Sequence, residues 1–225
     1  MPQKLPTIIF DLGGVYFTDG TARAIVTISD RYSIAVDAVM DIFHGDVGTA
    51  YRENKISENE FWRIAKTRWN IENVAMDDLS TIWLDGYAPI EGVVRIVQQL
   101  KEAGIELLYL SGSTKERIEY LEKKYHFMQH FKDGVLSFET GVRKPAILPY
   151  QCILQKASNP PRNCFYIDDK EKCLAPAKEL GMSTIFFTDV YSLCVDLKKM
   201  SLISGNADCA EEHKSNLVER NKGEL

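Results

Sequence analysis

The sequence predicts an α/β fold in which a doubly wound parallel sheet carries a helical cap inserted after its first strand. Two observations favour this fold class. In the second half of the chain, short apolar runs of strand length alternate with amphipathic helical segments, a pattern typical of β-α-β units with right-handed crossovers. Between the first apolar run and that alternation, residues 17–89 show helical patterns only.

The expected strands are four short apolar runs without a polar interruption, as in strands buried on both faces. They are TIIF (7–10), IELLYL (105–110), CFYI (164–167) and STIFF (183–187). A helix is expected over 91–104, where Val93, Ile96 and Val97 share one face and Gly104 ends the pattern. Three further helical segments follow at 115–125, 146–157 and 170–181.

The inserted segment contains four amphipathic stretches, ARAIVTISDRY, AVDAVMDIFHG, SENEFWRIAKTRWN and MDDLSTIWLDGY. Ser57 and Glu60 have the spacing of a capping box at the start of the third. A helical insertion at this point lies over the carboxyl edge of the sheet, where open α/β folds bind ligands. We therefore expect an α/β core from residues 1–16 and 90–200, a helical cap over 17–89 and a polar tail over 201–225.

Composition and charge exclude several classes of function. The 225 residues carry a formal net charge of −5, and no basic stripe is present, so nucleic acid is not an expected partner. Apolar runs are of strand length, too short to cross a membrane. Asp11 interrupts the first apolar run, which leaves no signal-peptide core. The expectation is a cytoplasmic protein with a small-molecule partner, and its oligomeric state stays open.

Polar side chains follow three of the predicted strands where each strand ends. Asp11 follows the first, Ser111 the second, and Asp168 with Asp169 the third, while Lys144 in GVRKP precedes the third strand. The carboxyl ends of parallel strands meet at one crevice. We therefore expect three carboxylates, one ammonium and one hydroxyl to lie close together.

This group of side chains suits phosphoryl transfer. Carboxylates that repel one another favour a divalent cation, and Mg²⁺ prefers oxygen ligands. Asp11 could attack phosphorus and form an aspartyl-phosphate that water later cleaves. Lys144 would balance negative charge and Ser111 would donate a hydrogen bond to the phosphoryl oxygens.

The segments FDLGGV, LYLSGS, GVRKP and YIDD occur in the order of the four motifs of the haloacid dehalogenase superfamily. The resemblance covers roughly residues 5–190 and is most specific where SFETGVRKP is followed by FYIDD. The inserted helices resemble that family's type 1 cap on a Rossmann-like core. The DLGGV motif and the stretch YRENKISENEFW resemble the sub-group with DLGGV or DLGNV motifs, which is associated with phosphatase activity on sugar phosphates.

By this resemblance the protein is a Mg²⁺-dependent phosphatase of a small phosphorylated metabolite. Asp11 would be the nucleophile and Lys144 the charge-balancing lysine, while Ser111 and its neighbour Gly112 would bind the phosphate. The implied metal ligands are Asp11, the backbone carbonyl of Gly13 and the pair Asp168–Asp169. Of that pair, Asp169 would bind directly and Asp168 would support it.

Three residues depart from the pattern of the family. Gly13 stands where phosphatases of the family carry an Asp that acts as general acid, Gly112 replaces an Asn, and an Asn after the paired acids is absent near Cys173. Loss of the acid predicts a steep dependence of rate on leaving-group pKa, because acid catalysis typically contributes about 10²–10⁴-fold. A backbone conformation that only glycine adopts easily is another reason for Gly13.

Two other functions stay open at this stage. The 2-haloacid dehalogenase branch lacks the same acid and uses the same nucleophile without metal, although the retained Asp168–Asp169 pair counts against it. A catalytically weak binding or regulatory module is favoured by Gly13 and Gly112, and opposed by the intact Asp11, Lys144 and Asp169.

Structural alternatives stand beside these roles. Ser111 could cap the following helix, Asp168–Asp169 the helix near residue 170, and Lys144 could simply open a helix at Pro145. The cap aromatics are expected to form its core: Phe61, Trp62, Trp69 and Trp83. Thr18 and Asp19 are loop residues that could replace the missing acid.

Overall fold

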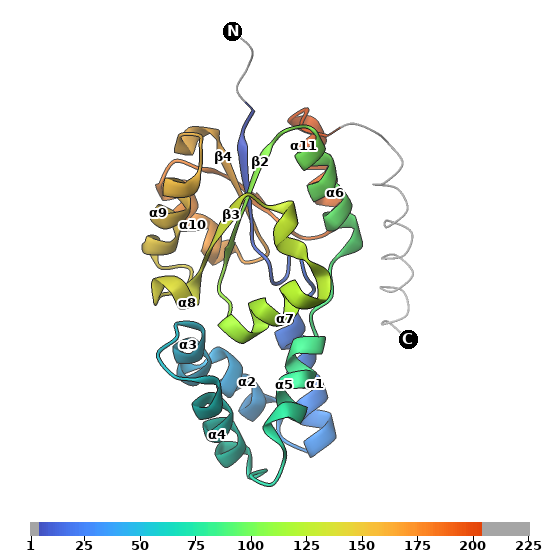
Figure 1. Ribbon diagram of the computed structural model, residues 1–225, viewed down its shortest axis with the longest axis vertical. Coiled ribbons are helices and arrows are strands. Elements are labelled where there is room, and N and C mark those ends of the chain that lie inside the picture. The colour runs from blue at the N-terminus through green and yellow to red at the C-terminus, as the bar shows by residue number, and fades with distance from the viewer. Residues whose placement is uncertain (1–4, 204–225) are drawn as a thin grey trace.

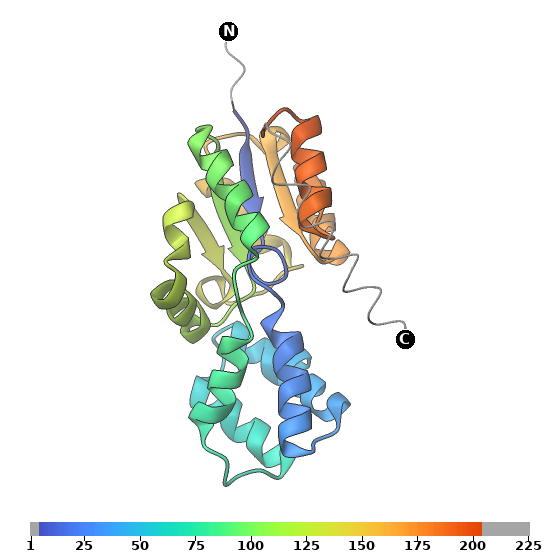
Figure 2. The ribbon, with the colours of Figure 1, turned by 90° about the vertical axis from the view of Figure 1, so that its right-hand side faces the viewer.

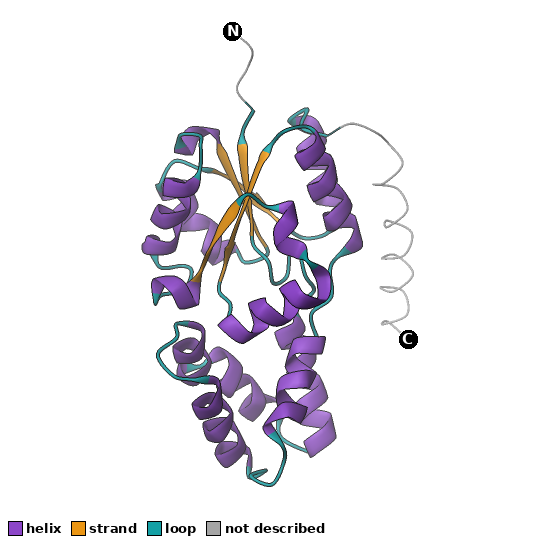
Figure 3. Cartoon of the chain, viewed as in Figure 1, coloured by secondary structure: helices purple, strands orange, loops and turns teal. Residues whose placement is uncertain are grey.

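The computed structural model describes residues 5–203, and its centre is a five-stranded parallel sheet with the order β3-β2-β1-β4-β5 (Figures 1 and 3). The strands are β1 (Thr7–Phe10), β2 (Glu106–Ser111), β3 (Asp133–Leu136), β4 (Cys164–Asp168) and β5 (Ser183–Phe186). The chain leaves β1 toward β2 and β3, then crosses to β4 and β5 on the other side. This reversal places the switch point of the sheet between β1 and β4.

Helices cover both faces of the sheet, as the doubly wound prediction requires. Helices α6 (Glu91–Glu102) and α11 (Val190–Lys199) lie on one face, and α9 (Ile147–Lys156) and α10 (Glu171–Glu179) on the other (Figures 1 and 2). Successive side chains of the central strand β1 point to opposite faces of the sheet. Ile8 and Phe10 belong to one buried cluster and Ile9 to the other. The fold class predicted from the sequence is confirmed.

The inserted helices form a separate bundle beyond the carboxyl edge of the sheet (Figure 1). They are α1 (Gly20–Tyr32), α2 (Val36–His44), α3 (Asp46–Arg52), α4 (Glu58–Trp69) and α5 (Met76–Asp85). The four aromatic residues expected in the cap core are buried, and Phe43 and Tyr51 pack among them. Helix α3 was not predicted, because Val47, Gly48 and Thr49 are poor helix formers.

Two chain segments connect the cap to the core, and they run side by side (Figure 2). Thr18 N donates to Ala88 O at 2.8 Å and Ile90 N to Tyr16 O at 2.9 Å. The Thr18 side chain adds two hydrogen bonds to the returning segment. Its hydroxyl is therefore committed to holding the connection, which argues against Thr18 as a substitute acid.

The remaining elements of the described residues are α7 (Lys115–Tyr125), η1 (Phe127–His130), α8 (Ser137–Thr140) and η2 (Pro161–Asn163). Most of the polar tail predicted over 201–225 lies outside the described residues, and Leu202 and Ile203 pack against the core. No helix among residues 5–203 combines the length and apolar character that crossing a membrane would need.

Two structural alternatives are wrong in this fold, and one holds in part. Thr114, not Ser111, accepts the capping hydrogen bond at the start of α7. The N-cap position of α10 is Lys170, whose backbone N–H donates to Asp168 Oδ1, while the Asp169 side chain makes no capping bond there. Helix α9 begins at Ile147, so Lys144 precedes the helix rather than opening it.

Candidate active site

A cavity of about 590 Å³ lies between the carboxyl edge of the sheet and the cap. All the sequence-predicted site residues except Asp169 line it, and Asp169 lies beside Asp11 and Asp168. We call Asp11, Lys144, Asp168 and Asp169 the carboxylate end of the cavity. The strand ends thus meet as the topology predicts.

Asp11 lies directly beyond β1, at the switch point of the sheet. Its backbone N–H donates to Ile167 O of β4 at 2.9 Å. Its Oδ1 accepts the Leu12 backbone N–H at 2.7 Å and lies 2.9 Å from Lys144 Nζ. Oδ2 accepts no hydrogen bond from residues 5–203, so one oxygen is held while the other can react.

Lys144 connects two of the acids from the loop before α9. Its ammonium lies 2.6 Å from Asp168 Oδ2 and donates to the Tyr166 hydroxyl at 2.7 Å. Tyr166 donates in turn to the same Asp168 oxygen, and Lys170 N donates to Asp168 Oδ1 at 2.8 Å. Every oxygen of Asp168 is therefore engaged in holding Lys144 and the start of α10.

The environment at this end shifts the pKa values of Asp11 and Asp168 in opposite directions. Burial raises the pKa of Asp11 to about 6, because Lys144 offsets only part of the desolvation. Burial acts in the same direction on Asp168, but Lys144 and Tyr166 outweigh it and hold that pKa below its ordinary value. Burial works against the charged form of Lys144, yet Asp11 and Asp168 together raise its pKa. Lys144 thus stays protonated.

Asp169 packs against the glycine-rich loop after β1. Burial raises the pKa of Asp169, and its buried Oδ1 has no hydrogen-bond partner among residues 5–203. A Cβ built on Gly14 would lie 2.4 Å from Asp169 Oδ2, and Gly14 has a φ of +99°. Gly14, rather than Gly13, is therefore the position that requires glycine, both for its backbone angle and for the approach of Asp169.

The donor set at the carboxylate end fits a divalent cation. One carboxylate oxygen from each of Asp11, Asp168 and Asp169 lies within 4.8 Å of the other two. A buried carboxylate oxygen without a partner is costly unless something binds it. No donor among residues 5–203 reaches the carbonyl oxygen of Gly13. Oxygen ligands of this kind are those that Mg²⁺ prefers.

Gly13 lies on the wall of the same cavity, in an ordinary conformation. Its φ lies outside the left-handed region, and a Cβ added there would meet only Tyr87 Cε1, at 3.6 Å. The conformational reason for glycine at this position is therefore wrong. Asp19 also lines the cavity, where its Oδ1 accepts the N–H groups of Thr21 and Ala22 and caps α1.

Ser111 and Gly112 form the wall next to Asp11. Ser111 is the last residue of β2 and is buried. The Gly112 carbonyl accepts a hydrogen bond from Arg117 Nη2 at 3.0 Å. A side chain at position 112 would have open space, since the nearest atom to an added Cβ is Arg143 Nε, at 4.0 Å.

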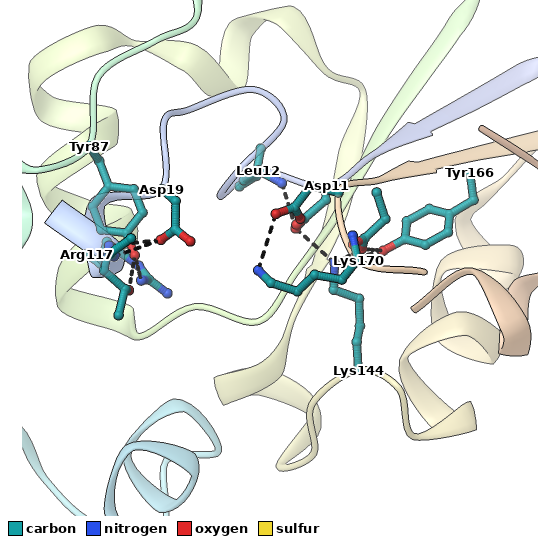
Figure 4. Close-up of polar contacts among 12 residues, drawn as sticks. Asp11, Leu12, Asp19, Tyr87, Arg117, Lys144, Tyr166 and Lys170 are labelled. Atoms are coloured by element: carbon teal, nitrogen blue, oxygen red, sulfur yellow. Dashed lines mark hydrogen bonds and ion pairs between the residues drawn. The ribbon is translucent and has the colours of Figure 1, made fainter. Parts of the chain in front are cut away.

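The far wall of the cavity carries groups that the motifs did not indicate. Figure 4 shows Tyr87 and Arg117 gathered across the cavity from Lys144 and Tyr166. Arg117 comes from α7 of the core and Arg52 from α3 of the cap, and both are 5% exposed. We call Arg52, Arg117 and Tyr87 the arginine end.

Lys170 is a further charged group that the motifs did not indicate. Its Nζ lies 3.5 Å from Asp169 Oδ2, and its side chain reaches toward Asp11 (Figure 4). Burial works against its charged form, but Asp11 and Asp169 raise its pKa. The only sequence signal for Lys170 was its place directly after the paired acids.

Comparisons with known proteins find relatives that cover most of the chain. The chain is 28% identical over 214 residues to an uncharacterized protein of Dictyostelium discoideum, covering 83% of this chain and 93% of that one. It is 20% identical to a sesquiterpene phosphatase of Aspergillus oryzae, covering 85% and 94%. A HAD family enzyme of Bacteroides thetaiotaomicron, solved with magnesium and inorganic phosphate, has the same fold, with a TM-score of 0.71, 20% identity and coverage of 82% and 95%.

The family comparison extends over most of the chain. A family model described as haloacid dehalogenase-like hydrolase matches residues 8–187. That span includes all four motifs and the helices between the first two. The chain therefore belongs to the haloacid dehalogenase-like hydrolase family.

Proposed function

We propose that this protein is a Mg²⁺-dependent phosphatase that hydrolyses a small phosphate monoester through a phosphorylated Asp11. The observation that carries the proposal is the buried Asp169 Oδ1, which lies close to the Asp11–Lys144 pair and has no hydrogen-bond partner in the described part of the chain. Dehalogenation without metal has no use for that carboxylate. The phosphatase named among the relatives and the magnesium–phosphate complex of the structural neighbour support the same chemistry.

The proposed roles follow from the contacts of each side chain. Asp11, Asp169 and the Gly13 carbonyl would hold Mg²⁺, with Asp168 supporting them through Lys144. When bound, the cation neutralises phosphoryl charge, so that an anionic nucleophile can approach. Lys144 carries positive charge at the same point, and Ser111 with Gly112 would bind the phosphoryl oxygens.

The reaction then runs in two steps. A carboxylate oxygen of Asp11 attacks phosphorus, the ester P–O bond breaks, and the leaving alkoxide takes a proton from water. Water next attacks the aspartyl-phosphate, which releases inorganic phosphate and restores the carboxylate. No acidic side chain occupies position 13, so leaving groups of low pKa should depart fastest.

The helical bundle would act as the cap domain of this site, with the boundaries expected from the sequence. Arg143, beside the lysine in GVRKP, donates from Nη1 to Thr49 Oγ1 of α3 at 2.9 Å. Ser137 Oγ donates to Arg52 O at 2.7 Å. These bonds hold the cap over the carboxylate end, where it would exclude water.

The test is phosphate release by purified protein from a panel of aryl, acyl and alkyl phosphates, with Mg²⁺ and with EDTA. Hydrolysis should require Mg²⁺ and return when EDTA is titrated out. Mg²⁺ should also raise the melting temperature, because it binds the native state. Activity that survives exhaustive chelation would favour the dehalogenase branch. Mg²⁺ binding without hydrolysis of any ester would favour a regulatory module.

A further inference from the structure

We propose that the arginine end of the cavity, Arg52 with Arg117, binds a second anionic group of the substrate. The preferred substrates would then be phosphate monoesters whose leaving group carries another phosphate or a carboxylate. This inference rests on the proposed function only for the phosphate that is transferred, which lies at the carboxylate end.

Arg52 is a buried cation without an anionic partner. Its Nη1 donates to two backbone carbonyls, Phe43 O at 2.6 Å and Gly48 O at 3.1 Å. Its Nε and Nη2 donate to no group among residues 5–203, and the side chain lines the cavity. Buried charges in proteins are normally paired or bound to a ligand. Two guanidinium nitrogens of Arg52 are thus available to an acceptor that enters the cavity.

Arg117 places a second buried cation beside the first. It donates from Nε to Ser113 Oγ at 2.8 Å and from Nη1 to the Tyr87 hydroxyl. Both guanidinium carbons lie over the Trp83 ring, Arg52 at 5.5 Å and Arg117 at 5.2 Å from its centroid. Among the described residues, no carboxylate lies within ion-pair distance of either.

The electrostatics at this end favour an added anion. Burial, with the nearby Arg117 charge as the next cause, lowers the pKa of Arg52 to about 9. The acids on the same wall are already engaged, because Glu53 accepts from Arg143 N and pairs with Lys55, while Asp19 caps α1. An anion between the arginines would relieve their repulsion and give each a charge-assisted hydrogen bond.

The cavity joins this pair of cations to the nucleophile. Asp11, Arg52 and Arg117 line the same space of about 590 Å³, which is within the range of sites for small organic ligands. Arg52 belongs to the cap and Arg117 to the core, so a ligand held by both would also hold the cap closed. One anionic group would then react at Asp11 while the other fixes the orientation of the leaving group.

The experiment compares esters that differ only in the second charge. Propyl phosphate, the phosphate ester of hydroxypropanoate and a propanediol bisphosphate, each also made with a longer chain, are assayed with wild-type protein and Mg²⁺. Their binding to the Asp11→Asn protein is measured by calorimetry. The two anionic esters should exceed the propyl ester by roughly 10- to 100-fold in kcat/KM and in affinity. Whichever of them is preferred identifies the second group as phosphate or carboxylate.

Arg52→Gln should remove most of that difference between the anionic esters and the propyl ester. Arg23→Gln, at an exposed position of α1 outside the cavity, is the matched control and should behave as wild type. Arg52→Lys keeps the charge, loses the forked donor geometry and should retain part of the preference. If Arg52→Gln does not fold, the Arg52→Lys protein and the comparison of esters with the wild-type protein still decide the proposal.

The outcomes separate this inference from the proposed function. Equal kcat/KM and equal affinity for neutral and anionic leaving groups, at both chain lengths, would overturn the second anion site while the phosphatase stands. Preferential binding of the anionic esters without hydrolysis of any ester would support the site and overturn the phosphatase.

Discussion

The two ends of the cavity differ in whether their buried charges are paired within the described part of the protein. At the carboxylate end, the ammonium of Lys144 lies within 2.9 Å of both Asp11 and Asp168. At the arginine end, Arg52 and Arg117 are as deeply buried, but their hydrogen-bond partners among the described residues are hydroxyl and carbonyl oxygens. At the first end opposite charges pair within the protein, whereas at the second end the positive charges have no anionic partner among the described residues.

By our proposals, the carboxylate end carries out the reaction and the arginine end selects the substrate. Groups at the carboxylate end come from two strand ends and the loop before α9 and contact one another, so their geometry exists before any ligand arrives. Groups at the arginine end come from the cap and from the core, so their spacing depends on how the cap docks. Substitutions at the first end should affect every substrate equally, and those at the second should discriminate among substrates.

The largest effect should come from Asp11→Asn, which keeps the shape of the side chain and removes its nucleophilic charge. Turnover of every ester should fall by about 10⁴-fold or more, as for other nucleophile deletions. Steady-state phosphate release, with circular dichroism to confirm the fold, measures this. Asp30→Asn, at an exposed position of α1, is the control and should be fully active. Substantial activity of Asp11→Asn would mean that another residue attacks phosphorus.

Asp169→Asn should come next, because it replaces the carboxylate whose Oδ1 lacks a partner. Mg²⁺ affinity should fall by more than the roughly 10- to 100-fold that typically follows loss of an outer-shell partner. Calorimetric titration of Mg²⁺ into the substrate-free protein gives this value without any assay of turnover. Unchanged Mg²⁺ affinity would remove Asp169 from the ligand set.

Gly13→Asp tests whether an acid on the cavity wall between the two ends can protonate the leaving group. The structure has room for the change, since the added Cβ meets only the Tyr87 ring, at 3.6 Å. A carboxylic acid here should raise turnover of alkyl phosphates by about 10-fold or more, part of the roughly 10²–10⁴-fold that general acids contribute. It should also flatten the dependence of rate on leaving-group pKa. Gly13→Asn, which cannot protonate the leaving group, is the control, and an equal gain with Asn would exclude acid catalysis.

The carboxylate end could be predicted from the sequence because each of its acids follows a strand. Asp11 and Asp168 stand directly after or at the end of uninterrupted apolar runs, and parallel strands bring such ends together. Strand β3 escaped prediction because Gly134 leaves only two apolar residues in DGVL. That glycine is required by packing across the sheet, since a Cβ there would lie 2.0 Å from the Tyr109 ring.

The arginine end could not be predicted, for the opposite physical reason. Arg117 lies in KERIEYLEKKY, where it resembles the solvated charges around it. It is buried against Tyr87 and against Trp83 of the cap, two contacts that the local pattern does not show. Arg52 ends a helix that the sequence did not indicate. Local patterns report neighbours along one strand or helix, whereas these contacts join residues from separate elements.

The smallest effects should come from alanine at the two adjacent glycines, where an added Cβ would meet Tyr87 at Gly13 and Asp169 at Gly14. At Gly14 the new Cβ would lie 2.4 Å from Asp169 Oδ2, with φ at +99°. Gly14→Ala should therefore lower the free energy of unfolding by at least roughly 1–3 kcal/mol, the usual cost of backbone strain, and weaken Mg²⁺ binding by displacing Asp169. Gly13→Ala should change stability by no more than about 1 kcal/mol, because its backbone already suits alanine. Urea unfolding of both proteins, with Mg²⁺ titrations, measures the pair. Equal stabilities and equal Mg²⁺ affinities would show that Asp169 does not need its close approach to the loop, and the distinction between the two glycines would then fail.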